Sequence, residues 1–210
     1  MAALGRCALV ATAWRALGKV TNAASRLPEQ LAADFTAQGL ALDAQQLLTS
    51  GMLLAPYFAR EGLQGARVLL LGPDSASGYV TRAGGHDWTN HRVDDWANDD
   101  QIEVLVIADQ RAVRWPKDLN RALNLIIRRQ NAGRSLHLLL CNPDLIFPSA
   151  PGRYSLTAGA MAVMLESVFA IQYPERPLAL QRLGKPSRPI FDEAPRPTWR
   201  LPGFGEFSSI

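Results

Sequence analysis

The sequence has few cysteines, no long apolar run and no acidic residue before Glu29. Two cysteines cannot form a disulfide framework, so we expect a reduced, cytoplasmic protein. No run of 18 apolar residues is present, so we expect no membrane-spanning helix and no membrane partner. The 22 Lys and Arg against 19 Asp and Glu give a net charge of +3, which is too small to indicate a nucleic-acid partner.

The first 19 residues carry arginines and no acids, as mitochondrial transit peptides do. The apolar stretch at 7–11 is short, however, and serine is missing from residues 1–19. We therefore interpret the segment as an ordinary helix and keep a mitochondrial location as the alternative.

The middle of the chain has the composition of a folded protein and three strand-like runs. Hydrophobic residues make up 48% and charged residues 20% of the 210 residues, which excludes disordered and fibrous classes. Residues 68–71, 102–108 and 136–141 are short apolar runs that end at turn residues. Such runs predict strands that are buried on both faces of a sheet.

Predicted helices alternate with these strands. Pro28 suits the start of one helix and Gly39 its end, and apolar spacing predicts a second helix from Pro116 to Gly133. A third is expected over 157–170, and Asp43 is a plausible cap for a short helical turn. The alternation predicts an α/β fold with a mostly parallel sheet.

Proline is concentrated near the end of the chain, where seven of the 14 prolines lie between 174 and 202. Proline lacks the amide hydrogen that helices and central strands need. We therefore expect no long helix and no central strand beyond 174, and an irregular tail at 195–210.

Four short motifs occur in a recognisable order. They are the segment Val20-Thr21-Asn22-Ala23-Ala24-Ser25-Arg26, the tetrapeptide Thr49-Ser50-Gly51-Met52, the pair Asn142-Pro143-Asp144 and Ala158-Gly159-Ala160, and finally Gly184-Lys185-Pro186-Ser187. Together they resemble the haloacid dehalogenase superfamily over about residues 17–194. The resemblance is to its class IIA branch, which includes N-acetylglucosamine phosphatases and 4-nitrophenylphosphatases.

The resemblance implies a Rossmann-like three-layer core, interrupted by a mobile α/β cap domain of the class IIA type. On this basis we expect the cap at 66–179, and an incomplete core made of residues 1–65 and 180–194. It also implies that a homodimer can form through the cap, as in similar proteins.

The family's chemistry is Mg²⁺-dependent hydrolysis of phosphate monoesters through a phosphoaspartate. The resemblance implies catalytic roles for Thr21 and Lys185, which would contact and neutralise the phosphoryl group of a small phosphorylated metabolite. It also makes Asn22, Asn142 and Asp144 candidates for substrate binding. For Asn142 and Asp144 the alternative is a turn in which each side chain bonds nearby backbone.

The sequence departs from the family pattern in its acidic motifs. The Asp-x-Asp-Gly motif expected before Thr21 is absent, and the only acids after Lys185 are Asp192, Glu193 and Glu206. We expect Asp192 and Glu193 to lie on the surface rather than to bind metal. The family implies Mg²⁺, but we find no ligands for it in this chain. We therefore predict an impaired phosphatase, with a catalytically silent, truncated homologue or a phosphate-binding protein as the alternative.

Several other groups are predicted to be structural. His86 and His91, with Asp87, Asp94 and Asp95 nearby, match no zinc spacing and indicate a solvated loop. The loop at 72–78 follows a strand but lacks the Gly-Lys-Ser/Thr of a phosphate-binding P-loop, which favours a simple turn.

Aromatic and basic side chains leave other interpretations open. Trp88, Trp96 and Trp115 could line a substrate pocket or pack inside the cap, and His137 lies in a predicted strand. A basic cluster, residues 128, 129 and 134, falls at a predicted helix end, where cations complement the helix dipole.

Overall fold

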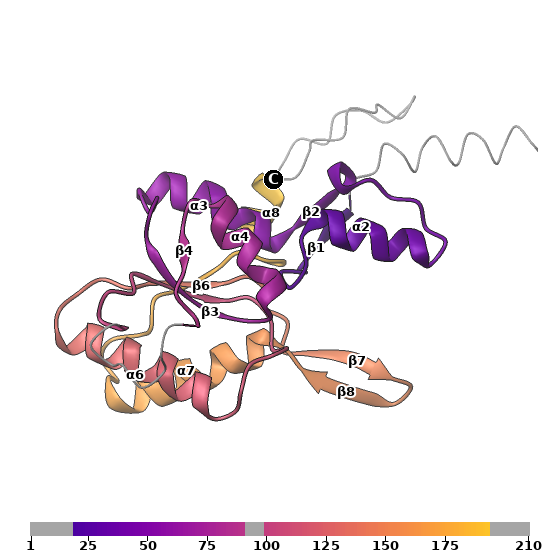
Figure 1. Ribbon diagram of the computed structural model, residues 1–210. Coiled ribbons are helices and arrows are strands. Elements are labelled where there is room, and N and C mark those ends of the chain that lie inside the picture. Colours follow the sequence, from indigo (N-terminus) through magenta and orange to yellow (C-terminus); the bar gives the residue numbers. More distant parts are fainter. Residues whose placement is uncertain (1–18, 91–98, 194–210) are drawn as a thin grey trace, which may run out of the picture.

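The computed structural model describes residues 19–90 and 99–193, and the elements follow the chain as strands and helices in alternation (Figure 1). The elements are β1 (Lys19–Thr21), α2 (Pro28–Ala37), β2 (Leu47–Thr49), α3 (Leu54–Glu61), β3 (Arg67–Leu71), α4 (Ser77–Arg82), β4 (His86–Asp87), β5 (Val104–Ile107), α6 (Lys117–Asn131), β6 (His137–Leu140), β7 (Ile146–Ala150), β8 (Arg153–Leu156), α7 (Ala158–Gln172), β9 (Leu180–Arg182) and α8 (Arg188–Asp192). The predicted α/β class is confirmed.

A five-stranded sheet in the order β4-β3-β5-β6-β9 forms the centre of the molecule, and all its strand pairs are parallel. Leu70 lies opposite Val106, and Val106 lies opposite Leu139, so the three predicted apolar runs are adjacent strands. The prediction of a mostly parallel sheet with buried strands is therefore confirmed.

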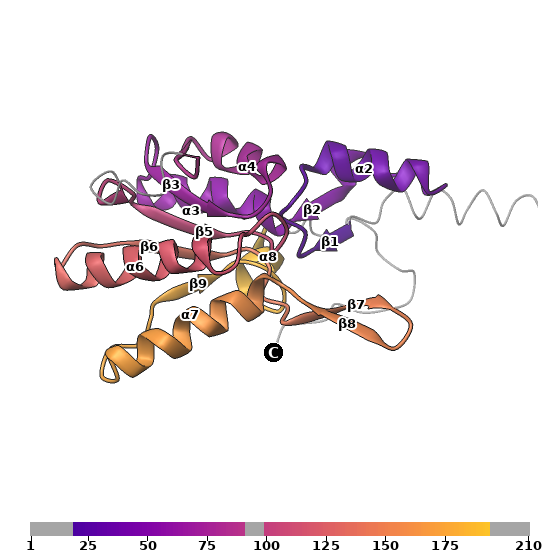
Figure 2. The ribbon, with the colours of Figure 1, turned by 60° about the horizontal axis from the view of Figure 1, so that its bottom comes forward.

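Helices cover both faces of this sheet (Figures 1 and 2). Successive side chains of β3 point to opposite faces, so Leu70 joins the core beneath α3 and α4, with Phe58 and Val80. Leu69 and Leu71 join the other core, together with residues of α6 and α7. The result is a three-layer arrangement, and four of its five strands lie in the segment 66–179 that was assigned to the cap.

The helix boundaries follow the local signals of the sequence. Helix α2 begins at Pro28, and Gly39 adopts a φ of +85° just after its end. Helix α6 begins after Pro116, and Gly133 has a φ of +64°. A positive φ costs glycine little, which is why the chain can turn sharply there. Asp43 precedes a single 3₁₀ turn, Ala44–Gln46, as expected.

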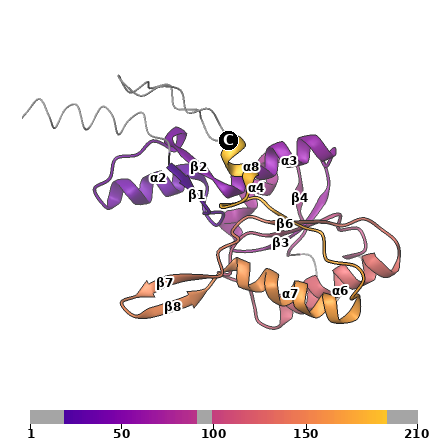
Figure 3. The same ribbon diagram turned by 180° about the vertical axis from the view of Figure 1, so that it is seen from behind.

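Two small sheets lie outside the five-stranded one. Strands β1 and β2 form a two-stranded parallel pair, with Thr21 opposite Thr49. Strands β7 and β8 form an antiparallel hairpin that projects from the rest of the molecule (Figure 3). The sequence did not predict this hairpin, because Pro148 and Pro151 argue against a strand pair. The hairpin tolerates proline because it has only two strands, and each strand has one side that pairs with no other strand.

The proline-rich region behaves as its composition predicts. Strand β9 is at the edge of the sheet and α8 is only five residues long. Because β9 pairs with β6, residues 180–182 share a sheet with the segment assigned to the cap. The division into a core at 1–65 and 180–194 and a cap at 66–179 stays a prediction. The predicted tail at 195–210 and residues 1–18 lie outside the described residues.

None of the helices within 19–90 and 99–193 combines the length and apolar character that crossing a bilayer requires.

Candidate functional site

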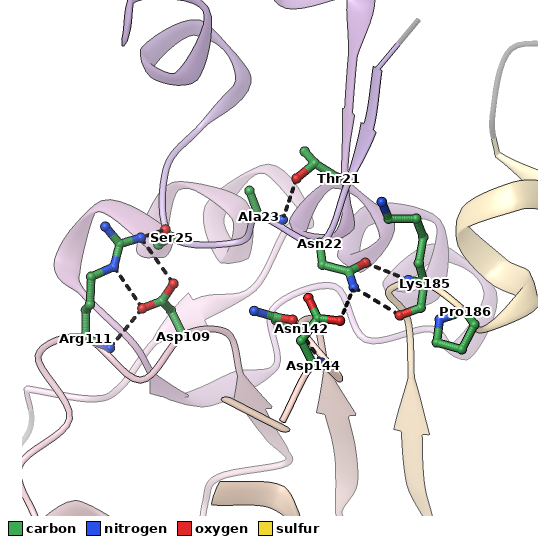
Figure 4. A pocket seen from close by; sticks show the side chains of 10 residues that line it. All are labelled: Thr21, Asn22, Ala23, Ser25, Asp109, Arg111, Asn142, Asp144, Lys185 and Pro186. Carbon is green, nitrogen blue, oxygen red and sulfur yellow. Dashed lines mark hydrogen bonds and ion pairs between the residues drawn. The ribbon is translucent and has the colours of Figure 1, made fainter. Parts of the chain in front are cut away.

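A cavity of about 590 Å³ opens where chain segments leave the carboxyl ends of β1, β5, β6 and β9 (Figure 4). Loops at this edge of a parallel sheet are the usual location of ligand sites in α/β proteins. The lining residues are Thr21, Asn22, Ala23, Ser25, Asp109, Arg111, Asn142, Asp144, Lys185 and Pro186. All five predicted site residues are among them, so the structure brings together side chains from three distant segments.

The Asn22 side chain connects these three segments. Its Nδ2 donates to Asp144 Oδ1 at 3.1 Å and to the Lys185 carbonyl oxygen at 3.0 Å. Its Oδ1 accepts the Lys185 backbone N–H at 2.6 Å. Asn22 is only 8% exposed, and both its amide hydrogens are used. Its geometry therefore fits positioning of Lys185 and Asp144 rather than direct contact with a ligand.

Two motif glycines allow the loops to approach this closely. A Cβ on Gly184 would lie 2.3 Å from the Cys141 carbonyl oxygen and 2.7 Å from Asn22 Oδ1. A Cβ on Gly159 would lie 2.3 Å from the Asp144 carbonyl oxygen. Glycine is therefore required at 159 and 184 for a steric reason. Any side chain there would push apart the loops that build the cavity.

The two predicted catalytic side chains keep free bonding capacity. Thr21 Oγ1 accepts the Ala23 backbone N–H at 3.3 Å, which leaves its hydroxyl hydrogen available for a ligand. Within the described residues, Lys185 Nζ makes neither an ion pair nor a hydrogen bond. A hydroxyl donor and an ammonium group on one cavity are suited to binding a phosphoryl group.

The Thr49-Ser50-Gly51-Met52 motif supports the loop after β1 through hydrogen bonds. Thr49 Oγ1 donates to Tyr79 OH at 2.7 Å, and Tyr79 OH donates to the Arg26 carbonyl oxygen at 2.6 Å. Ser50 Oγ donates to the Ala23 carbonyl oxygen at 3.3 Å. Burial raises the pKa of Tyr79 to about 12, so this hydroxyl stays protonated and keeps donating into the alkaline range. The motif therefore has a structural role in holding the loop that carries Thr21.

Asn142, but not Asp144, makes the local backbone bond of the turn given as an alternative, and both residues line the cavity. Asn142 Oδ1 accepts the Asp144 backbone N–H at 3.1 Å, which is the local bond of an Asx turn. The Asp144 carboxylate is held by Asn22 on one oxygen only. A role of Asn142 and Asp144 in substrate binding stays a prediction.

Three polar residues of the cavity lining were not predicted as site residues: Ser25, Asp109 and Arg111. Arg111 donates to both carboxylate oxygens of Asp109, from Nε at 3.0 Å and from Nη2 at 3.1 Å, and Nη2 also donates to Ser25 Oγ. The hydrogen bond to Asp109 raises the pKa of the Arg111 guanidinium further. One signal was present, since Asp109 directly follows the apolar run at 102–108 and so had to lie at the carboxyl edge of the sheet.

The described residues do not fit a magnesium site. Mg²⁺ prefers oxygen ligands with octahedral geometry, usually including one or two carboxylates. Both oxygens of Asp109 are occupied by Arg111, and Asp144 is bonded to Asn22. No group of three or more His, Cys, Asp or Glu side chains in residues 19–90 and 99–193 could hold a metal ion.

Other candidate residues lie away from the cavity. Asp192 and Glu193 are exposed at the end of α8, as expected for surface positions. His137 Nδ1 bonds Tyr57 OH at 3.0 Å, which fits the structural role expected from its strand position. His86 is exposed on β4, whereas His91, Asp94 and Asp95 lie outside the described residues.

The tryptophans do not line the cavity where they are described. Trp88 is partly buried against the core beneath α6 and α7, and Trp115 is 71% exposed. Trp96 lies outside the described residues. For Trp88, the structure therefore favours the packing interpretation.

Comparison with known proteins relates this arrangement to phosphatases. Residues 12–86 match the haloacid dehalogenase-like hydrolase family. A solved structure from Cytophaga hutchinsonii, described as a possible sugar phosphatase of this superfamily, is similar with 28% identity and a TM-score of 0.67. The similarity covers 82% of this chain and 56% of that one. No curated protein sequence matches this chain.

Two further structures share the fold. A glycerol phosphate phosphatase from Mycobacterium tuberculosis, solved with magnesium, has 23% identity and a TM-score of 0.67 over 84% of this chain and 47% of its own. A p-nitrophenyl phosphatase from Archaeoglobus fulgidus has 23% identity and a TM-score of 0.61 over 84% and 59%. The chain thus spans about half the length of the structures it resembles.

The three-layer parallel fold, the motif order and these similarities define the class of protein. The family match over residues 12–86 and the similarity to a structure of this superfamily relate the chain to the haloacid dehalogenase superfamily. The α/β layers between the motifs of Thr21 and Lys185 agree with the resemblance to the class IIA branch.

Proposed function

We propose that this chain binds a small phosphorylated metabolite in the cavity at the sheet edge, as a phosphatase-type member of its superfamily. The observation that carries the proposal is the pair Thr21 and Lys185, which come from distant segments, line one cavity and keep free donors. An ammonium group and a hydroxyl can together bind a phosphoryl group by charge-assisted hydrogen bonds. Asn22 fixes the position of Lys185 through its backbone and so holds the pair together.

Hydrolysis through a phosphoaspartate needs a free carboxylate next to the phosphorus atom. The carboxylates that line the cavity are Asp109, which is ion-paired with Arg111, and Asp144, which accepts a hydrogen bond from Asn22. We therefore propose that this chain binds phosphate monoesters and hydrolyses them weakly or not at all. The alternative, an active Mg²⁺-dependent phosphatase, is an outcome that the experiment below distinguishes.

The charges around the cavity also suggest the kind of substrate. The Arg111 charge is offset by Asp109, and the exposed Asp144 adds a negative charge. Only Lys185 is left to balance a ligand's anionic group among the described lining residues. This favours a metabolite with one phosphate and an uncharged, hydroxyl-bearing remainder over one that carries a second acid.

Calorimetric titration of the chain tests the proposal. Glycerol 3-phosphate and 3-phosphoglycerate share a phosphate and differ by one carboxylate, and we expect the former to bind more tightly. Lys185→Ala should weaken glycerol 3-phosphate binding about tenfold or more, because it removes a charge-assisted contact. Lys117→Ala, at the exposed start of α6, is the matched control and should leave binding unchanged.

Equal binding by the Lys185→Ala variant and the parent chain would contradict the proposed phosphate site. Turnover of p-nitrophenyl phosphate with Mg²⁺, lost in Lys185→Ala, would instead establish the active phosphatase. The cytoplasmic location and the homodimer through residues 66–179 stay predictions, and light scattering of the purified chain would test the homodimer.

A further inference from the structure

A second cavity, of about 380 Å³, lies at the carboxyl end of α6. Its lining residues are Asp100, Arg128, Arg129, Asn131, Ala132 and Arg134. Helix α6 runs back along the sheet from the carboxyl edge, so its last turn lies beside the residues that lead into β5 and β6. Arg129 bonds the Ile102 carbonyl oxygen there, two residues before β5 begins. The cavity is therefore at the opposite end of the strands from the candidate phosphate site.

The charges around this cavity are unbalanced. Arg128 Nε donates to Asp100 Oδ1 at 3.1 Å, so the acid that lines the cavity already has a cationic partner. The neighbouring Asp99 is bound by the buried Arg121. Arg129 and Arg134 have no carboxylate within ion-pair distance in the described part of the chain.

Arg129 is the more unusual of these two arginines because it is only 9% exposed. Its Nε and Nη2 donate to the Ile102 carbonyl oxygen, which is uncharged. Burial lowers the pKa of Arg129, the Arg134 charge lowers it further, and Glu103 and Asp100 act in the opposite direction. A buried guanidinium without an adjacent anion is unfavourable, and a bound anion would relieve this cost.

The remaining polar group on the cavity is also a donor. Tyr173 OH donates to Asn131 Oδ1 at 2.6 Å, so the side-chain oxygen of Asn131 is occupied. Asn131 Nδ2 makes no hydrogen bond to the described residues. The cavity thus offers guanidinium and amide N–H groups, which complement an oxyanion.

We propose that this cavity binds a small polyvalent oxyanion, such as a phosphate compound or a polycarboxylate, through Arg129, Arg134 and Asn131. Arginine suits such ligands because its planar fork donates two parallel hydrogen bonds. The complementarity of cations to the helix dipole accounts for arginines in the last turn of α6, but not for a cavity between them. Two uncompensated charges fit a small anion better than a nucleic-acid backbone, whose binding needs many phosphate contacts.

The test uses the full chain carrying Lys185→Ala, so that the candidate phosphate site does not compete. Titration calorimetry with pyrophosphate and with citrate then measures binding and distinguishes a phosphate ligand from a carboxylate one. Arg134→Ala should weaken binding about tenfold, as expected for a lost charge-assisted contact. Arg153→Ala, an exposed arginine on β8, is the matched control and should have no effect.

Arg129→Met should also weaken binding, and a melting curve shows whether this buried change preserves the fold. Because Arg134 is exposed, its variant remains informative if Arg129→Met fails to fold. The proposal would be overturned if Arg134→Ala left the affinity unchanged. It would also be overturned if the Lys185→Ala chain, before any arginine is replaced, bound neither pyrophosphate nor citrate. Binding of a single-stranded oligonucleotide without binding of either small anion would overturn it too.

Discussion

The five-stranded sheet and the β1–β2 pair differ in how they are held. Strands β3, β5 and β6 are buried almost throughout, whereas no residue of β1 is fully buried. Yet β1 and the loop after it carry Thr21 and Asn22, the residues that bring the candidate site together. The difference indicates that the sheet supplies most of the stability, while the site depends on a few close contacts between loops.

The largest effect on stability is expected from Leu139→Ala, on the interior strand β6 of the sheet. Leu139 is fully buried in β6, and such a truncation costs about 2–5 kcal/mol because it leaves a cavity. Val20→Ala, in β1, should cost less, because Val20 is only partly buried. Urea unfolding followed by circular dichroism measures both free energies.

Equal losses of stability in Leu139→Ala and Val20→Ala would contradict the distinction between the two regions. Ligand binding provides a second check. If Leu139→Ala remains folded at the working temperature, it should bind glycerol 3-phosphate as the parent chain does.

Gly184→Ala should have the opposite profile, with a smaller loss of stability and a severe loss of binding. The added Cβ would clash with the Cys141 carbonyl oxygen and with Asn22 Oδ1, at 2.3 and 2.7 Å. Overpacking of this kind costs about 1–3 kcal/mol, and here it would displace the Asn22–Lys185 contact. Calorimetric titration with glycerol 3-phosphate measures the loss of affinity.

Gly152→Ala is the control for this prediction. Gly152 has a positive φ, of +70°, but a Cβ added there would meet no atom within 4 Å. The variant should lose some stability through backbone strain and keep its affinity. Normal affinity in Gly184→Ala would show that the loops do not need this close approach.

Much of the fold was predictable because its elements carry strong local signals. The apolar runs of β3, β5 and β6 correspond directly to buried positions in the structure. Helix α6 was located correctly, but the expectation that its arginines lie outside is wrong for Arg121 and Arg129, which are buried. The β7–β8 hairpin was not predictable, because its pairing depends on a register across a proline-containing turn. Strand β1 is three residues long and gives too short a pattern to be recognised reliably.

The candidate site was predictable only where motif residues marked it. Thr21, Asn22 and Lys185 were named from motifs, and the structure places them on one cavity. Asp109 and Arg111 were missed because a lone acid after a strand does not reveal which cation will face it. That ion pair depends on the turn after β5, which only the folded backbone defines.

A further effect on stability is expected from alkaline pH, which acts through two buried groups rather than through a substitution. Complete burial raises the pKa of the Cys141 thiol from 9.0 to about 12, and burial raises that of Tyr79 from 10.0 to about 12. The folded chain therefore keeps protons that the unfolded chain releases. Stability should be complete below pH 9 and fall as pH rises toward 12, by up to about 1.4 kcal/mol per pH unit for each group.

Urea unfolding at pH 8, 9, 10 and 11 measures this trend. Cys141→Ala should remove the part that begins near pH 9 and leave the part due to Tyr79, which begins near pH 10. A stability that is constant from pH 8 to pH 11 would show that these buried groups are not shielded as described.

The central claim is that Thr21 and Lys185, held in place by Asn22, form one phosphate-binding site. The most direct measurement is a titration of the isotope-labelled chain with glycerol 3-phosphate, followed through its amide NMR signals. We predict saturable shifts at Thr21, Ala23 and Lys185 that disappear in Lys185→Ala and persist in Lys117→Ala. Shifts confined to other parts of the chain, or shifts that persist unchanged in Lys185→Ala, would contradict the account.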